Sequence, residues 1–240
     1  MLKEIKDYYN LADCVKKYSE DIETVGLWNS EKHIFKKYLK PTYKILDVGC
    51  GAGRTTINLY KDGFKDILGL DIANNPIEYA KNYCNQNSLD LDFVVGSATE
   101  LEFENDTFDA VIFSYNGLVC IPGAENRSKA VREICRVLKP NGLFIFTAQD
   151  RANEKFKQFW IEEKQRWDTN TQDEKLEKYG DRYLLDENGH MSYIHIASIS
   201  EIQELCESNG FEIIEKVNNL EIGTPDEIKR ETIFWVVRKK

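Results

Sequence analysis

Short apolar runs alternate with amphipathic segments along most of the chain, and this alternation predicts strands and helices in turn. We expect strands near residues 44–48, 66–71, 91–96, 108–114 and 142–148. The stretches between them place apolar residues on one helical face and predict helices near 54–62, 76–87 and 128–138. Such an alternation is typical of a parallel sheet covered by helices on both faces.

The two ends of the chain complete this picture. Residues 1–40 predict a helical cover in which Ser30 caps a helix that ends before Pro41. Residues 211–217 and 232–238 predict two more strands, joined by a connection too short for a crossover helix. The fold class is therefore α/β: a doubly wound, mostly parallel seven-stranded sheet with an antiparallel last strand, an N-terminal helical cover and an insertion after strand five.

The first predicted strand runs directly into a glycine-rich turn. Glycines at positions 49, 51 and 53 allow positive φ and let a ligand approach the main chain. The helix that follows offers unpaired N–H groups at its N-terminus. The second strand ends in Asp71, the position at which an α/β sheet holds the two hydroxyls of a ribose.

The spacing of this turn argues against a dinucleotide. The dinucleotide fingerprint G-x-G-x-x-G would need a third glycine where the chain has Arg54, and the Asp47 carboxylate would repel a pyrophosphate. We therefore expect no useful binding of NAD or NADP. Asp47 and the three glycines instead resemble motif I of the class I S-adenosylmethionine-dependent methyltransferases, and Asp71 matches the ribose-binding acid of that family.

Later segments extend the resemblance, which covers residues 41–150 closely and 198–240 more loosely. The third strand ends at Ser97, where the family most often has Asp, and residues 108–117 and 129–142 match the family in kind. The resemblance implies S-adenosyl-L-methionine as cofactor. It implies cofactor contacts from Asp47, Gly49, Cys50, Gly51, Gly53, Asp71, Ile72, Ser97, Ala98, Ser114 and Tyr115.

On this basis we expect one methyltransferase domain over residues 1–240. Its parts are a helical lid, a cofactor-binding core, an acceptor-side insertion and a C-terminal helix with strands, at residues 1–40, 41–150, 151–198 and 199–240. Residues 1–30 and 150–197 are the segments free to roof the strand tips, so we place the methyl acceptor beneath them. The insertion can equally be a helical segment that packs on the edge of the sheet.

Several polar and aromatic residues are candidates for acceptor binding. We expect Asn116, Tyr9, Tyr18 and Trp28 to contact the acceptor, although the aromatic ones can simply pack the N-terminal segment onto the domain. Residues 191–197 alternate, so Ile194 and Ile196 would face a core and Tyr193 and His195 the other side. His195 is then the candidate general base, with Tyr193 beside it; otherwise His195 is a hydrogen-bonded core or surface residue.

Composition and charge restrict the partners, the cellular compartment and the metal sites that we expect. The chain has 240 residues, a formal net charge of −9 and a pI of about 5.1, which disfavours nucleic acid as a partner. Six scattered cysteines without a C-x-x-C pair disfavour a disulfide framework and favour a cytoplasmic protein. No apolar run is long enough to span a membrane, and the three histidines stand without ligand-spaced acids or cysteines, so no metal site is expected.

The expected activity is in-line methyl transfer to a small-molecule acceptor. Residues 180–183 and the pair Tyr193 and His195 loosely resemble the acceptor region of tRNA wobble-uridine carboxymethyl methyltransferases, which is one alternative. A non-catalytic protein that binds a nucleoside or a protein partner is another. The acceptor and the oligomeric state do not follow from these patterns.

Overall fold

A computed structural model describes residues 2–186, 188–224, 227 and 231–240. Its strands are β1 Ile45–Val48, β2 Ile67–Asp71, β3 Asp92–Val95, β4 Phe108–Phe113, β5 Leu138–Ala148, β6 Asp181–Leu185, β7 Met191–His195, β8 Phe211–Asn218 and β9 Ile233–Lys239. Its α-helices are α1 Leu2–Tyr9, α2 Ala12–Thr24, α3 Asn29–Tyr38, α4 Arg54–Lys61, α5 Asn74–Gln86, α6 Ala124–Val137, α7 Lys157–Asp168, α8 Ile199–Glu207 and α9 Asn219–Ile222. Two short 3-10 helices are η1 Gly117–Cys120 and η2 Glu154–Phe156.

Seven of these strands form one sheet in the order β3-β2-β1-β4-β5-β9-β8. The first five along the chain pair in parallel, whereas β9 runs antiparallel to both β5 and β8. This confirms the predicted fold class. The strand order reverses between β1 and β4, so the loops after these two strands diverge at the carboxyl edge of the sheet and leave a crevice there.

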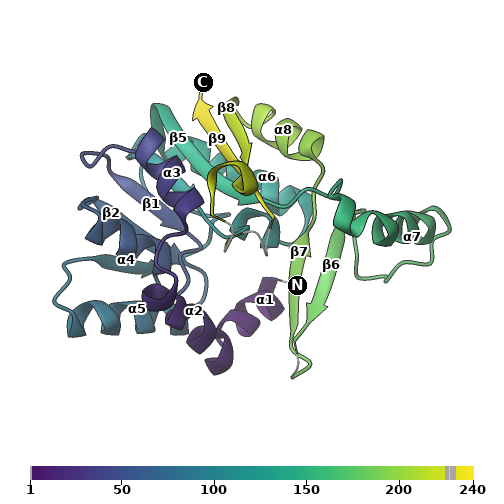
Figure 1. Ribbon diagram of the computed structural model, residues 1–240, viewed down its shortest axis with the longest axis horizontal. Coiled ribbons are helices and arrows are strands. Elements are labelled where there is room, and N and C mark those ends of the chain that lie inside the picture. Colours follow the sequence, from purple (N-terminus) through teal and green to yellow (C-terminus); the bar gives the residue numbers. More distant parts are fainter. Residues whose placement is uncertain (1, 187, 225–226, 228–230) are drawn as a thin grey trace.

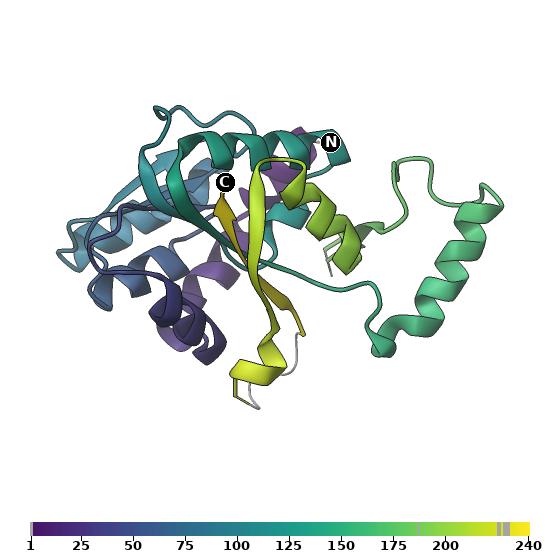
Figure 2. The ribbon, with the colours of Figure 1, turned by 90° about the horizontal axis from the view of Figure 1, so that it is seen from above.

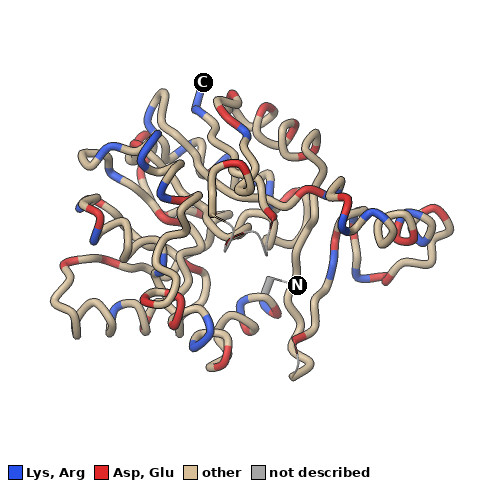
Figure 3. Tube along the Cα trace, in the orientation of Figure 1, with Lys and Arg blue, Asp and Glu red and all other residues tan. Residues whose placement is uncertain are grey.

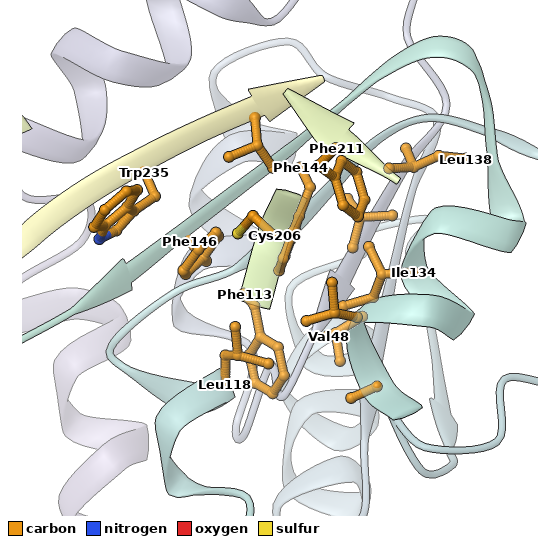
Figure 4. Packing of buried hydrophobic residues seen from close by; sticks show 14 of the residues in the cluster. Val48, Phe113, Leu118, Ile134, Leu138, Phe144, Phe146, Cys206, Phe211 and Trp235 are labelled. Carbon is orange, nitrogen blue, oxygen red and sulfur yellow. The ribbon is translucent and has the colours of Figure 1, made fainter. Parts of the chain in front are cut away.

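One face of the sheet packs against α6 and α8. Phe144 and Phe146 of β5 stack with centroids 4.6 Å apart, and Phe146 stacks on Trp235 of β9 at 6.2 Å. Figure 4 shows these rings together with Ile134 of α6 and Cys206 of α8. The alternation of the strands places Ile145 on the opposite face.

The opposite face packs against α3 and α4, while α5 and α2 cover its β3 end. Ile34 and Phe35 of α3 are fully buried against strand residues such as Ile45 and Ile112. Part of the predicted N-terminal cover is therefore a layer of the fold, and only α1 and α2 extend towards the carboxyl edge (Figure 1).

The insertion between β5 and α8 contains more than the predicted helix. Helix α7 projects away from the sheet in both views (Figures 1 and 2), and Lys, Arg and acidic residues are interspersed along it (Figure 3). Strands β6 and β7 form a separate two-stranded antiparallel hairpin, and α1 packs against β7. The β6 strand was not predicted, because its charged start and its two exposed leucines, Leu184 and Leu185, carry no alternating pattern.

One helix start differs from the prediction. Ser30 does not cap α3: it lies inside the helix and is buried, and the Trp28 N–H donates instead to the Glu31 carboxylate at 3.0 Å. Helix α8 begins with a capping box formed by Ser198 and Glu201. In both helices the glutamate at the third helical position accepts the N–H of the residue before the helix, as in a capping box.

Candidate active site

A cavity opens at the carboxyl edge of the sheet, over the tips of β1, β2, β3 and β4. Its floor consists of the turns that follow these strands. The predicted cofactor residues that line it are Asp47, Gly49, Cys50, Gly51, Asp71, Ile72, Ser97, Ala98, Ser114 and Tyr115. Gly53 lies between two lining residues, Ala52 and Arg54.

The steric reason for glycine differs among the three positions of the turn. A Cβ on Gly49 would lie 2.4 Å from Phe113 Cε2, and one on Gly53 would lie 2.9 Å from Phe93 Cζ. A Cβ on Gly51 would meet nothing within 4 Å, because this position faces the cavity. All three have positive φ, which favours glycine. The first and last glycines therefore serve packing, and the middle one leaves space for a ligand.

Asp71 connects the tip of β2 to this turn. Its Oδ2 accepts a hydrogen bond from the Gly51 N–H at 2.9 Å, and its Oδ1 accepts one from the Ala73 N–H at 2.8 Å. Burial raises the pKa of this carboxyl, although the backbone hydrogen bonds act in the opposite direction. Each carboxylate oxygen retains acceptor capacity, so Asp71 can still receive the hydroxyl groups of a sugar.

Asp47 is a nearly inaccessible carboxyl at the end of β1. It is 1% exposed, and its Oδ2 accepts a hydrogen bond from Thr56 Oγ1 at 2.6 Å. Burial raises its pKa to about 7. A carboxylate that pays this desolvation cost favours a cationic partner, because an opposite charge would restore its ionised form.

Arg54, the first residue of α4, lies beside Asp47 but pairs with the N-terminal cover. Its Nη2 and Nη1 donate to the two Glu31 oxygens at 2.6 and 2.7 Å, and Nη1 also donates to the Gly26 carbonyl at 2.7 Å. The guanidinium lies 5.8 Å from the centroid of the Tyr115 ring. This bidentate pair neutralises the charge of Arg54 and attaches the start of α3 to the glycine turn.

The loop after β4 holds two consecutive residues in the left-handed region, Tyr115 and Asn116, at φ 56° and 63°. The Asn116 N–H donates to Thr147 Oγ1 at 2.8 Å, and the Asn116 Oδ1 accepts from Thr232 Oγ1 at 2.9 Å. These bonds hold Asn116 against β5 and the segment before β9. Tyr115 lines the cavity, whereas Asn116, the predicted acceptor contact, is not among its lining residues.

Tyrosines of the N-terminal helices roof the cavity. Tyr9 of α1 and Tyr18 of α2 line it, and the Tyr18 ring lies 6.3 Å from Tyr9 and 6.2 Å edge-on from Tyr115. Trp28, the third predicted aromatic contact, is not a lining residue. It stands at the start of α3, where its backbone is held by Glu31, away from the roof.

Ile194 and Ile196 pack towards the core as predicted, but Tyr193 and His195 on the other side of the strand do not line the cavity. They are 2% and 3% exposed, and they share one oxygen of buried Asp181. The Tyr193 hydroxyl and His195 Nδ1 lie 2.5 and 2.7 Å from Asp181 Oδ1. The polar side of β7 can also be buried, because the carboxylate of Asp181 across the hairpin accepts hydrogen bonds from both side chains.

This buried network reaches the cavity wall through one arginine. Arg127 Nη1 donates to the Tyr193 hydroxyl and to the Ile121 carbonyl, both at 2.9 Å. Ile121 lines the cavity. The insertion therefore supports the wall from behind, and none of the lining residues comes from 151–198, the predicted acceptor-side segment.

The described residues contain no group of three or more His, Cys, Asp or Glu that could hold a metal ion. None of the helices in the described ranges has the length and apolarity needed to cross a bilayer. All six cysteines are free thiols.

Comparisons with known proteins agree with this geometry. Residues 45–142 match a family model described as a methyltransferase domain. The chain is 34% identical over 143 residues to the uncharacterized protein MJ1252 of Methanocaldococcus jannaschii, which covers 60% of this chain and 51% of that protein. It is 34% identical over 105 residues to a demethylmenaquinone methyltransferase of Leptospira interrogans, at 42% of this chain and 41% of that protein.

A solved structure extends the likeness to the fold. An S-adenosylmethionine-dependent methyltransferase from Methanosarcina mazei superposes with a TM-score of 0.71, covering 86% of this chain and 96% of that one at 22% identity. Residues 45–142 therefore form a domain of the methyltransferase family, and the chain shares the fold of this solved structure. The chain spans about half the length of the first curated relative it matches, or less of the others.

Several residues of this cavity were not identified from the sequence. Arg54 follows the last glycine of motif I, so its position beside the turn could be read from the motif, but its partner Glu31 could not. Ile5 and Asp21 line the cavity from α1 and α2. Their place depends on how these helices fold back over the sheet, which no local pattern reveals.

The glycines of the methyltransferase turn allow a matched comparison. Gly49→Ala and Gly51→Ala both force alanine into positive φ, at a cost of roughly 1–2 kcal/mol. Only Gly49→Ala also drives a methyl group into Phe113, which adds about 1–3 kcal/mol. Urea unfolding should therefore show the larger loss for Gly49→Ala. Equal losses would contradict the packing role of Gly49.

The buried histidine should make folding sensitive to acid. Burial lowers the pKa of His195 below its ordinary value of 6.5. The unfolded chain then binds a proton near pH 6.5 before the folded chain does, so the contribution of His195 to stability is complete above that pH and declines below it. We expect the unfolding free energy of the wild type, relative to His195→Gln, to fall between pH 7 and 5, by at most about 1.4 kcal/mol per pH unit.

Exposed His33 provides the control for this measurement. His33→Gln makes the same substitution at an exposed histidine, so its pH profile is measured beside that of His195→Gln. A His195→Gln protein that follows the wild-type pH profile would rule out the buried neutral histidine.

Proposed function

We propose that this chain transfers a methyl group from S-adenosyl-L-methionine to a small-molecule acceptor. The observation that carries the proposal is the convergence of the buried Asp47, the open Gly51 position and Asp71 in one cavity at the switch point of the sheet. The methyltransferase family match over residues 45–142 supports it.

The residues present fit this cofactor. Asp71 has acceptor capacity for the ribose hydroxyls, and Asp47 is a desolvated carboxyl suited to the amino-acid ammonium group. Ser97 and Ala98 line the part of the cavity next to the tip of β3, where we place the adenine. When bound, the cofactor supplies an activated methyl group on a sulfonium.

The residues of the chain then position the cofactor and the acceptor, and they exclude water from the cavity. The tyrosine rings of the roof offer their negative faces to a cation, which favours the charged cofactor over its uncharged-sulfur product. With the cofactor and the roof in place, an acceptor held beside the methyl group needs mainly alignment for in-line transfer. No residue is proposed as general base, because the cavity wall lacks His195.

The acceptor class rests on two lines of support. One relative is named for demethylmenaquinone, a small molecule, and the wall above the strand tips is made mainly of apolar and aromatic side chains. We propose that α1 and α2 form the lid, that residues 41–150 form the cofactor-binding core, and that the insertion supports the lid and wall from outside.

The proposal is tested by turnover with methyl-labelled cofactor. Label should pass into the small-molecule fraction of a cell extract and not into its RNA fraction. Label in RNA would instead support the tRNA-methylating alternative. Tight binding of S-adenosylhomocysteine without transfer to either fraction would support a binding protein.

Asp47→Asn should separate stability from cofactor affinity. The amide keeps an acceptor for Thr56 but removes a buried charge, so the unfolding free energy should not decrease. S-adenosylhomocysteine should bind with about 1.5–3 kcal/mol less free energy, because a hydrogen bond to a charged group is lost. Calorimetry that shows unchanged affinity in the folded variant would refute the ammonium assignment.

The same carboxyl predicts a pH dependence of binding. With its pKa at about 7 in the free protein, Asp47 is increasingly protonated below that pH and loses its attraction for an ammonium group. Affinity for S-adenosylhomocysteine should be level just above pH 7 and fall by about tenfold per pH unit well below it. Asp47→Asn should abolish this slope. A wild-type affinity that is flat from pH 5 to 8 would contradict the mechanism.

A further inference from the structure

The cavity has two ends with different chemistry. The strand-tip end carries Asp47 and Asp71. The other end is formed by side chains of α1, α2 and the segment that ends η1, and we call it the acceptor chamber: Ile5, Tyr9, Tyr18, Cys120, Ile121 and Pro122. Because the proposed cofactor occupies the strand tips, this chamber is the part of the cavity left for the molecule that receives the methyl group.

The polar groups of the chamber are uncharged at neutral pH. The Tyr9 hydroxyl and the Cys120 thiol both line this chamber. Burial raises the pKa of Cys120 to about 11, and the pKa values of Tyr9 and Tyr18 are also raised. The chamber thus offers hydroxyl and thiol hydrogen bonds within an apolar wall, which suits a ligand with few polar groups.

The cavity offers no cation to balance an acidic acceptor. Among the described residues that line it, Arg54 is the only basic side chain, and both Glu31 oxygens already engage its guanidinium. Three carboxyls line the same space, those of Asp21, Asp47 and Asp71. The resulting negative potential opposes the entry of an anion, because uncompensated charge is costly in a partly desolvated site.

The ring geometry indicates the shape of the ligand. Tyr9, Tyr18 and Tyr115 form a chain of tilted and edge-on contacts from the roof to the loop after β4. Edge-to-face packing of this kind extends naturally to a further flat ring, with centroids 4.5–7 Å apart in typical aromatic pairs.

Resting on the proposed function, we propose that the acceptor is an uncharged, mainly apolar, ring-bearing molecule that binds in the acceptor chamber against Tyr9 and Tyr18. Phosphorylated and other anionic acceptors are excluded by the same wall. The proposal assigns acceptor selection to α1, α2 and the η1 segment, and it leaves the strand tips to the cofactor.

The test uses two probes that differ by one charge, a naphthalenediol and the same diol carrying a ring sulfonate. Calorimetry first measures S-adenosylhomocysteine binding, which tests the proposed function by itself. Each probe is then titrated into the protein saturated with S-adenosylhomocysteine. We expect the neutral diol to bind at least about tenfold more tightly than its sulfonate, since the chamber offers the sulfonate no free cation and the Asp21 carboxylate repels it.

Three variants test which side chains determine the affinities of the two probes. Tyr18→Ala should weaken the neutral diol by about tenfold through the lost ring contact. Tyr79→Ala, which removes an exposed tyrosine of α5, should change neither probe. Asp21→Lys replaces a carboxyl of the wall by a cation, so it should strengthen sulfonate binding while the diol is little affected. S-adenosylhomocysteine affinity should stay near the wild-type value in Tyr79→Ala, and it is measured in Tyr18→Ala so that the diol is titrated into a saturated protein.

Three outcomes would overturn the assignment while leaving the cofactor proposal intact. They are equal binding of the two probes, binding of neither probe to the S-adenosylhomocysteine complex, and a Tyr18→Ala protein that holds the diol as tightly as the wild type. Failure of S-adenosylhomocysteine itself to bind would instead refute the proposed function, and the two failures are distinguished by the first titration.

Discussion

The carboxyl edge of this sheet depends on how closely the turn after β1 approaches two phenylalanine rings. Phe113 and Phe93 occupy the volume that side chains at positions 49 and 53 would need. The turn therefore lies flat on the strand tips, and its middle residue can donate its N–H to Asp71. The positions of Asp47, Asp71 and the start of α4 all follow from this contact, and so does the space above Gly51.

Features built from neighbouring residues could be predicted from the sequence. Local apolar runs indicate the seven strands, and the spacing of a few small residues indicates the glycine turn. The antiparallel last strand followed from the short connection before it. These features agree with the structure because each depends on backbone propensity and on a core that local patterning already defines.

The residues predicted around the acceptor were harder to place, for physical reasons. His195 and Tyr193 lie on a strand whose polar side is buried, because Asp181 across the hairpin accepts from both. Asn116 is drawn to Thr147 and Thr232, which come from distant parts of the chain. Such partners depend on tertiary contacts, so an alternating pattern alone does not reveal that the polar side is buried as well.

Arg127 has a consequence for how this domain can diversify. One of its nitrogens contacts both the cavity wall at Ile121 and the hairpin at Tyr193. Insertions outside the sheet accept sequence change more readily than the strands do. Drift in the hairpin can therefore be transmitted to the wall of the acceptor chamber while the glycine turn and Asp71 stay as they are. An ancestral enzyme of this kind would have a route to new acceptors that does not pass through its cofactor site.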